Sequence, residues 1–207
     1  MRVQFIAIVG GSGSGKTWLA QRLLEELGDQ AGRLSLDDFY RDQSHLTPAE
    51  GRGVNFDHPN AIDWLLFKRT LKAIGHGEKA FLPTYDFATH TRQAVKRQWQ
   101  PRQLVMLDGL WLLRSAQLRN SYSFSVFSEC PESLRRQRRL YRDRHERGRS
   151  AATINRQFDQ QVAPMHGRFI APQSRLADIV IQSPPTIAQL KTLGARCREL
   201  LNHERQK

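Results

Sequence analysis

Cysteine is scarce in this 207-residue sequence, which contains only Cys130 and Cys197. Neither belongs to a CxxC pair or to the spacing of Cys and His that zinc sites use. The sequence therefore supports neither a disulfide framework nor a zinc site.

Long apolar runs, repeats of fixed period and tracts of biased composition are also lacking. The apolar run at residues 5–9 is far too short to span a membrane, and the glycine-rich segment that follows it does not fit a cleavable signal. We expect a protein that stays in the cytoplasm. With 39% hydrophobic and 25% charged residues, the chain is typical of a globular protein, and its length fits one domain over residues 1–207.

Acidic residues are too few to balance the basic ones. The 32 Lys and Arg outnumber the 20 Asp and Glu, which gives a net charge of +12 that comes mainly from arginine. Such an excess predicts an anionic partner. Composition leaves two partners open, a nucleic acid and a compact polyphosphate.

Residues 10–17 form the most informative motif. They match the P-loop pattern G-x-x-x-x-G-K-[ST] at every required position, after an apolar strand-like run and before a segment of helical period. The motif consists of Gly10, Gly11, Ser12, Gly13, Ser14, Gly15, Lys16 and Thr17. Its backbone N–H groups are expected to hold the phosphates of ATP or GTP, with Lys16 at the β- and γ-phosphates and the Thr17 hydroxyl on Mg²⁺. The alternative is a glycine-rich turn that carries Lys-Thr by chance.

Short apolar runs and helical segments alternate along the rest of the chain. We predict strands at residues 3–9, 33–36, 104–107, 123–127 and 178–181. We predict helices after the P-loop, from Asn60 as N-cap, from Pro131 to about Arg147, and after Pro184 and Pro185. This order predicts a P-loop three-layer α/β/α fold with a central parallel sheet.

Three local features lie outside this alternation or at its edges. Residues 79–99 lack helical period and predict a small β-excursion beside the substrate site. Residues 131–165, rich in arginine at their start, predict a helical lid. Asp108 ends a buried strand, where a P-loop fold places the carboxylate that holds the magnesium hydration shell, although it could instead cap a helix.

A P-loop does not by itself distinguish kinases from GTPases, motors and helicases. The sequence lacks the Asn-Lys-x-Asp element with which GTPases read their base, and Asp108-Gly109-Leu110-Trp111 is not an Asp-x-x-Gly switch. The GTPase class is therefore excluded.

Further motifs distinguish among the remaining classes. Over about residues 5–183 the chain resembles the uridine kinase and phosphoribulokinase family, and within that family the uridine-cytidine kinases. The resemblance rests on the P-loop, Asp37-Asp38-Phe39-Tyr40, Asn55-Phe56-Asp57-His58-Pro59, Tyr85-Asp86-Phe87 with His90-Thr91-Arg92, Glu146-Arg147-Gly148-Arg149 and Ala177-Asp178-Ile179-Val180. It implies transfer of the γ-phosphate of ATP or GTP to the 5′-hydroxyl of uridine or cytidine, giving UMP or CMP in pyrimidine salvage. It also implies a homo-oligomer, a tetramer or a dimer.

The resemblance also implies roles for single residues. Asp37 faces the acceptor hydroxyl, with Lys16 and Arg142 as further catalytic groups, while Asp57 and Arg139 bind the ribose hydroxyls. The pyrimidine ring lies among Tyr40, Phe56, Tyr85 and Phe87, and its edge meets His90, Arg149 and Gln157. Arg142, Arg147 and Arg149 belong to the lid that closes over the triphosphate. Without these motifs, the aromatic residues fit a plain core, and several arginines fit a solvated helix face.

Three departures from the family pattern leave questions open. Asp38 stands where many relatives carry a small polar residue, so it competes with Asp37 for the acceptor role. Asp108 stands where many carry glutamate, and Gln182-Ser183-Pro184 replaces a common Pro-Arg-Gly, which leaves ATP and GTP both open as donors. Two alternatives remain: a kinase of the same fold acting on pantothenate, glycerate or nicotinamide riboside, and a nucleic-acid-binding ATPase that uses the arginine stripe.

Overall fold

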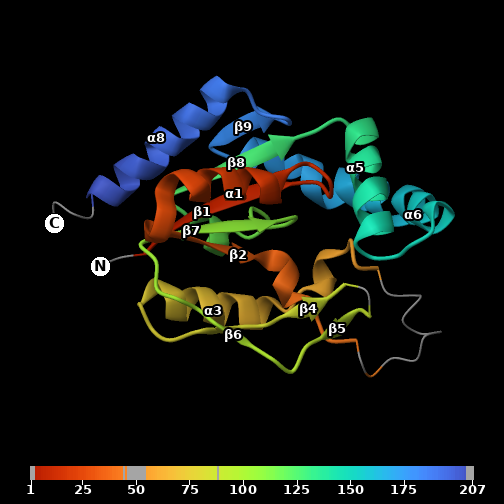
Figure 1. Cartoon of the computed structure of the whole chain (residues 1–207), viewed down its shortest axis with the longest axis horizontal. Coiled ribbons are helices and arrows are strands. Elements are labelled where there is room, and N and C mark those ends of the chain that lie inside the picture. Colours follow the sequence, from red (N-terminus) through yellow and green to blue (C-terminus); the bar gives the residue numbers. More distant parts are fainter. Residues whose placement is uncertain (1–2, 44, 46–54, 88, 204–207) are drawn as a thin grey trace.

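A five-stranded parallel sheet forms the centre of the computed structural model, which describes residues 3–43, 45, 55–87 and 89–203 (Figure 1). Its order is β2-β7-β1-β8-β9. The strands are β1 (Gln4–Gly10), β2 (Ala31–Ser35), β7 (Leu104–Gly109), β8 (Phe124–Glu129) and β9 (Ile179–Gln182). The predicted parallel sheet is confirmed, and β1, which feeds the P-loop, is its middle strand.

Helices cover both faces of the sheet. Ile6 and Ile8 of β1 pack on one face with residues of α1 (Lys16–Leu27) and α8 (Ile187–His203). Phe5, Ala7 and Val9 point the other way, toward α3 (Trp64–Gly75). Because side chains alternate along a strand, one apolar run supplies both cores. Figure 1 shows α1 and α8 on the face opposite α3, the predicted three-layer arrangement.

The predicted start of α3 is wrong by three residues. Pro59–Ala61 form a 3-10 turn, and the ring nitrogen Nδ1 of His58 caps it by accepting a hydrogen bond from the Asn60 N–H at 3.1 Å. The N-cap of α3 is Asp63, whose carboxylate accepts a hydrogen bond from the Leu66 N–H at 3.0 Å. Proline suits the first turn of a helical segment, so Pro59 gives this region a short turn of its own before α3.

Residues 79–99 contain the expected short strands. β3 (Phe81–Leu82) pairs with β6 (Arg97–Gln98), and β4 (Tyr85–Asp86) pairs with β5 (Thr91–Arg92), all antiparallel. Short 3-10 helices at Gly28–Gln30 and Leu36–Phe39 flank β2. The latter carries Asp37 and Asp38 at the carboxyl edge of the sheet.

The chain after β8 is mainly helical, and its first two helices stand beyond the carboxyl ends of the strands (Figure 1). It begins with α5 (Glu132–His145) and α6 (Ala151–Gln157). Irregular turns follow: π-helical Phe158–Val162, α7 (Ala163–Met165), π-helical His166–Ile170 and 3-10 Ala171–Leu176. A short helix, α4 (Ala116–Arg119), joins β7 to β8. Within the described part of the chain, no helix combines the length and apolarity needed to cross a bilayer.

Candidate active site

A cavity of about 570 Å³ opens at the carboxyl ends of the central strands. The structure brings most of the predicted site residues to its wall: Ser12, Gly13, Gly15, Lys16, Thr17, Asp37, Tyr40, Phe56, Asp57, Tyr85, Phe87, His90, Asp108, Arg139, Arg142, Arg147, Arg149 and Gln157. Gly10, Gly11 and Ser14 of the P-loop are not part of the wall. Ligands of parallel sheets bind at this edge, so the position fits a substrate site.

The P-loop follows β1 directly and is shaped by close packing. Gly13 has a φ of 80°, and a Cβ there would lie 2.5 Å from the backbone oxygen of Arg135, so a larger residue does not fit. The Lys16 ammonium donates a hydrogen bond to the Gly11 carbonyl at 2.9 Å. Burial lowers the pKa of Lys16. A buried lysine at the start of α1, beside a tight glycine loop, fits the binding of anionic phosphates.

Thr17 and Asp108 meet next to the P-loop. The Thr17 hydroxyl donates to the Asp108 carboxylate at 3.0 Å, and both oxygens are hard ligands of the kind Mg²⁺ takes, with water completing its shell. Arg33 of β2 also donates two hydrogen bonds to the Asp108 carboxylate, from Nε at 2.8 Å and from Nη2 at 3.1 Å. This fork was not predicted. It holds the carboxylate in one orientation while the hydroxyl of Thr17 stays beside it.

Asp37 and Asp38 have different surroundings. Asp37 lines the cavity, and its buried Oδ1 has no hydrogen-bond partner among the described residues. Burial raises the pKa of Asp37, and the charge of Asp108 adds to this effect while Lys16 opposes it. Asp38 lies outside the cavity wall, 3.8 Å from Arg97, and burial raises its pKa to about 6. Of the two carboxylates, Asp37 is the one placed with Lys16.

Aromatic rings form one end of the cavity. Tyr40 lies 5.3 Å from Tyr85 and 6.0 Å from Phe56 between ring centroids, and its hydroxyl donates to the Phe56 carbonyl at 3.0 Å. Phe87 packs against Tyr85 at 5.2 Å. Phe56 stacks on His90 at 4.0 Å. Flat, mostly buried walls of this kind suit a flat ring as ligand.

His90 brings a polar edge to this aromatic end. Burial, together with the charge of Arg149, lowers the pKa of His90 to about 4, so the ring is neutral at pH 7. Arg149 donates to Nε2 of His90 at 2.7 Å and to the Phe87 carbonyl at 3.2 Å. His90 also has a φ of 59°, which is rare for a residue with a side chain. Such strain at a cavity wall points to a functional constraint.

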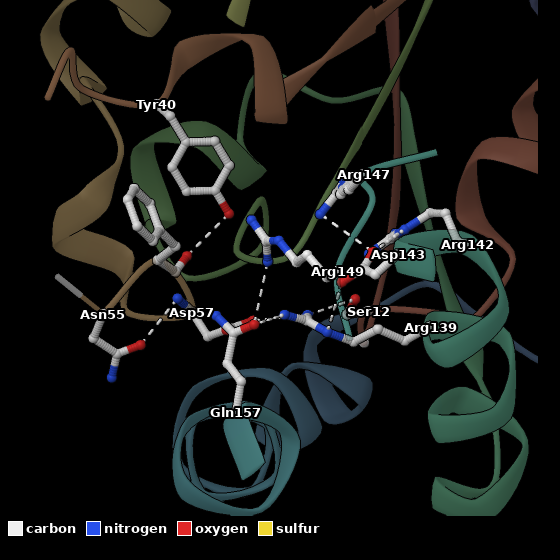
Figure 2. A network of polar contacts seen from close by, with 12 residues as sticks. Ser12, Tyr40, Asn55, Asp57, Arg139, Arg142, Asp143, Arg147, Arg149 and Gln157 are labelled. Carbon is white, nitrogen blue, oxygen red and sulfur yellow. Dashed lines mark hydrogen bonds and ion pairs between the residues drawn. The ribbon is translucent and has the colours of Figure 1, made fainter. Parts of the chain in front are cut away.

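Arg139 of α5 joins the two ends of the cavity (Figure 2). Its guanidinium lies 3.5 Å from Asp57, donates to the Ser12 hydroxyl at 3.1 Å and donates to Gln157 at 3.0 Å. Gln157 also accepts from Arg149 at 3.3 Å. Burial raises the pKa of Asp57, with Arg139 opposing this rise. One arginine therefore contacts both the P-loop and the carboxylate at the aromatic end.

Sequence reasoning missed several residues of this region. Trp18, Gln21, Leu110, Arg138 and Glu146 also line the cavity. Trp18 directly follows the P-loop motif, and in the structure 49% of its surface is exposed. An aromatic residue next to the P-loop was the signal in the sequence that could have identified it. Buried Asp143, which joins three arginines of the cavity wall, was also missed, because an acid among the arginines of a basic helix is typical of a surface ion pair.

The P-loop lies at the end of the middle strand of a parallel sheet and faces the aromatic end of the same cavity, an arrangement that indicates a P-loop phosphotransferase. Comparison with known proteins narrows this class. Residues 5–189 match the model of the phosphoribulokinase/uridine kinase family, and the chain belongs to that family.

Curated relatives agree with this placement, and a solved structure shares the fold. The uridine kinases of Salmonella typhimurium (strain LT2) and Salmonella typhi are each 38% identical to the chain over 181 residues, which cover 85% of either sequence. The phosphoribulokinase of Rhodobacter spheroides superimposes with a TM-score of 0.63 over 87% of this chain and 70% of that one. At 16% identity it shares the fold alone.

Proposed function

We propose that this protein is a nucleoside kinase that transfers the γ-phosphate of ATP or GTP to the 5′-hydroxyl of uridine or cytidine. The observation that carries the proposal is one cavity that holds the P-loop and Asp37 beside an aromatic pocket edged by His90 and Arg149. The 38% identity to uridine kinases supports the same acceptor.

The acceptor end offers a fitting partner to each part of a nucleoside. Asp57 is buried, and its Oδ2 has no hydrogen-bond partner among the described residues, so it is free to accept from a ribose hydroxyl. Its two oxygens match a vicinal diol, and Arg139 lies 3.5 Å from one of them. We expect the ring to pack against the aromatic end of the cavity, which Tyr40, Phe56, Tyr85 and Phe87 form, with His90 and Arg149 presenting hydrogen-bonding groups to its edge.

Asp37 and the cationic groups carry the transfer itself. Phosphoryl transfer has a loose transition state, so positioning and charge balance dominate over strong proton abstraction. Asp37 orients the 5′-hydroxyl and accepts its proton late in the reaction. Lys16, Arg142 and Arg147 surround the phosphates with positive charge. When bound near Thr17 and Asp108, Mg²⁺ would neutralise phosphate charge.

A screen of ADP release tests the acceptor. We expect turnover with uridine and cytidine, and none above background with pantothenate, glycerate or nicotinamide riboside, because those acceptors do not combine a pyrimidine edge with a ribose diol. Lys16→Ala serves as the inactive control. Turnover with one of the other alcohols, and none with the two nucleosides, refutes the acceptor while leaving the kinase class intact.

A second assay separates the kinase from a nucleic-acid-binding ATPase. The ATPase would bind polynucleotide with a steep salt dependence and hydrolyse ATP faster in its presence. We expect neither at low salt, because five of the arginines line the cavity that holds the P-loop.

Donor choice, location and assembly follow from the family resemblance. We propose ATP or GTP with Mg²⁺ as donor, action in the cytoplasm and a homo-oligomer, either dimer or tetramer. Competition between the two triphosphates and the mass by light scattering test the donor and the assembly.

A further inference from the structure

Asp143 of α5 is a fully buried carboxylate whose side chain has no exposed surface. Burial of an unpaired carboxylate is unfavourable, so buried acids are paired. Asp143 has three cationic neighbours: its oxygens lie 2.8 Å from Arg142, 3.4 Å from Arg139 and 3.4 Å from Arg147. Burial alone would raise the pKa of Asp143, but these guanidinium groups outweigh it and lower the pKa. Asp143 is therefore held as an anion.

All three arginines line the cavity. Arg142 forms its contact through both Nε and Nη2, each 2.8 Å from the same carboxylate oxygen. Arg147 reaches across to the ring of Phe87, 4.6 Å from its centroid. Figure 2 shows the arginine side chains gathered around Asp143. The carboxylate therefore sits behind the cationic wall rather than inside the substrate space.

The backbone of Asp143 takes part as well. Its carbonyl accepts a hydrogen bond from the Arg149 N–H at 3.1 Å, across a turn in which Gly148 has a φ of 63°. This bond fixes the chain where it leaves α5 and sets the direction of Arg149 toward His90. One residue thus fixes three arginines by charge and a fourth through the backbone.

We propose that Asp143 is a positioning residue for phosphoryl transfer. It holds Arg142 and Arg147 where they can bind the triphosphate, and it holds Arg139 beside Asp57. The proposal rests on the proposed function for its reaction, although its nucleotide-binding part does not depend on the acceptor. An arginine has many rotamers, so a fixed anion behind it removes the reorganisation otherwise needed when phosphate binds. Asp143 acts through these arginines and does not itself contact a substrate in this proposal.

The test compares Asp143→Asn with Asp143→Glu and with a matched control, Asp178→Asn. Asp178 is also a carboxylate with short internal hydrogen bonds, accepting from the backbone and hydroxyl of Ser125 at 2.7 Å each, and it lies outside the cavity wall. Each variant is measured for thermal unfolding, for binding of a non-hydrolysable ATP analogue, and for kcat and KM with uridine.

We expect Asp143→Asn to lower kcat/KM about 10- to 100-fold, the range found for residues that orient the ligands of a reactive centre. We expect analogue binding to weaken by at least fivefold, and Asp143→Glu to recover part of both losses because it keeps the charge. Asp178→Asn should lower the unfolding temperature without changing kcat per folded molecule.

Unchanged analogue binding and kcat in folded Asp143→Asn would overturn the proposal. Equal losses of kcat in Asp178→Asn would do so too, because they would assign the effect to general destabilisation. If Asp143→Asn does not fold, Asp143→Ser, which also removes the charge, takes its place: wild-type kcat and wild-type analogue binding in that variant refute the positioning role. Failure of the wild type to phosphorylate uridine or cytidine refutes the proposed acceptor, and the analogue titration still tests Asp143.

Discussion

Replacing Asp37 with asparagine separates the two tasks assigned to this carboxylate. Asparagine keeps one acceptor oxygen of nearly the same position, so it can still orient the 5′-hydroxyl, but it cannot take the proton. General acid–base catalysis contributes about 10²- to 10⁴-fold in enzymes, and a loose transition state places this case near the lower end. We therefore expect kcat to fall about 100-fold, which corresponds to about 2.8 kcal/mol at about 1.4 kcal/mol per decade.

The stability of Asp37→Asn is expected to move in the opposite direction. Because burial raises the pKa of Asp37, the folded protein binds the proton more tightly than the unfolded chain does. This contribution to stability is full below the unfolded pKa and is lost as pH rises through the higher folded pKa. At pH 7 the variant should thus be at least as stable as the wild type.

Steady-state kinetics with uridine and urea unfolding at pH 7 measure both effects. The wild-type kcat/KM should also show an acidic limb above the usual carboxyl range, and Asp37→Asn should lack it. A folded variant with kcat within threefold of the wild type would refute the role of Asp37. So would a variant that loses uridine binding along with turnover, because orientation should survive.

Three further outcomes follow from the same site. Asp38→Asn should keep kcat within about threefold, since Asp38 pairs with Arg97 outside the cavity wall; a 100-fold loss would reassign the acceptor role. Trp18 lines the cavity and is 49% exposed, so ATP should change the tryptophan fluorescence, and Trp18→Phe should abolish that change while the protein still binds ATP by calorimetry. His90→Ala should raise KM for uridine about tenfold, the effect of losing an interaction of about 1.4 kcal/mol, with little change in KM for ATP; the reverse pattern would place His90 on the donor side.

The sequence was sufficient to place the local motifs on the fold. Residues 10–17 after β1, and Asp108 near the end of β7, follow rules of spacing and strand position that need no knowledge of distant contacts. The central sheet was predictable for the same reason. β2 nevertheless begins two residues before the predicted start at residue 33. The prediction left out Gly32 because glycine has a low strand propensity. In the fold its missing side chain leaves room for Trp99, which lies 2.8 Å from where a Cβ would stand.

Contacts that depend on tertiary packing were not predictable. The sequence gives no sign that Arg33 forks onto Asp108, since the two residues lie on neighbouring strands 75 positions apart. Asp143 is the clearest case. Its spacing of four residues from Arg139 and Arg147 predicts ordinary pairs on a helix surface, and only the packing of α5 against the cavity turns them inward.

The position of Arg139 also has a consequence for substrate binding. A single guanidinium contacts Ser12 of the P-loop and Asp57 of the acceptor end. The substrate that binds first therefore fixes the conformation of the Arg139 side chain for the substrate that binds second. The affinities of the two substrates are then linked, and thermodynamic reciprocity requires that each changes the other's dissociation constant by the same factor. Binding of a nucleoside and of a triphosphate analogue, each measured with and without the other, should therefore close a four-sided cycle with a coupling factor that Arg139→Met reduces toward one.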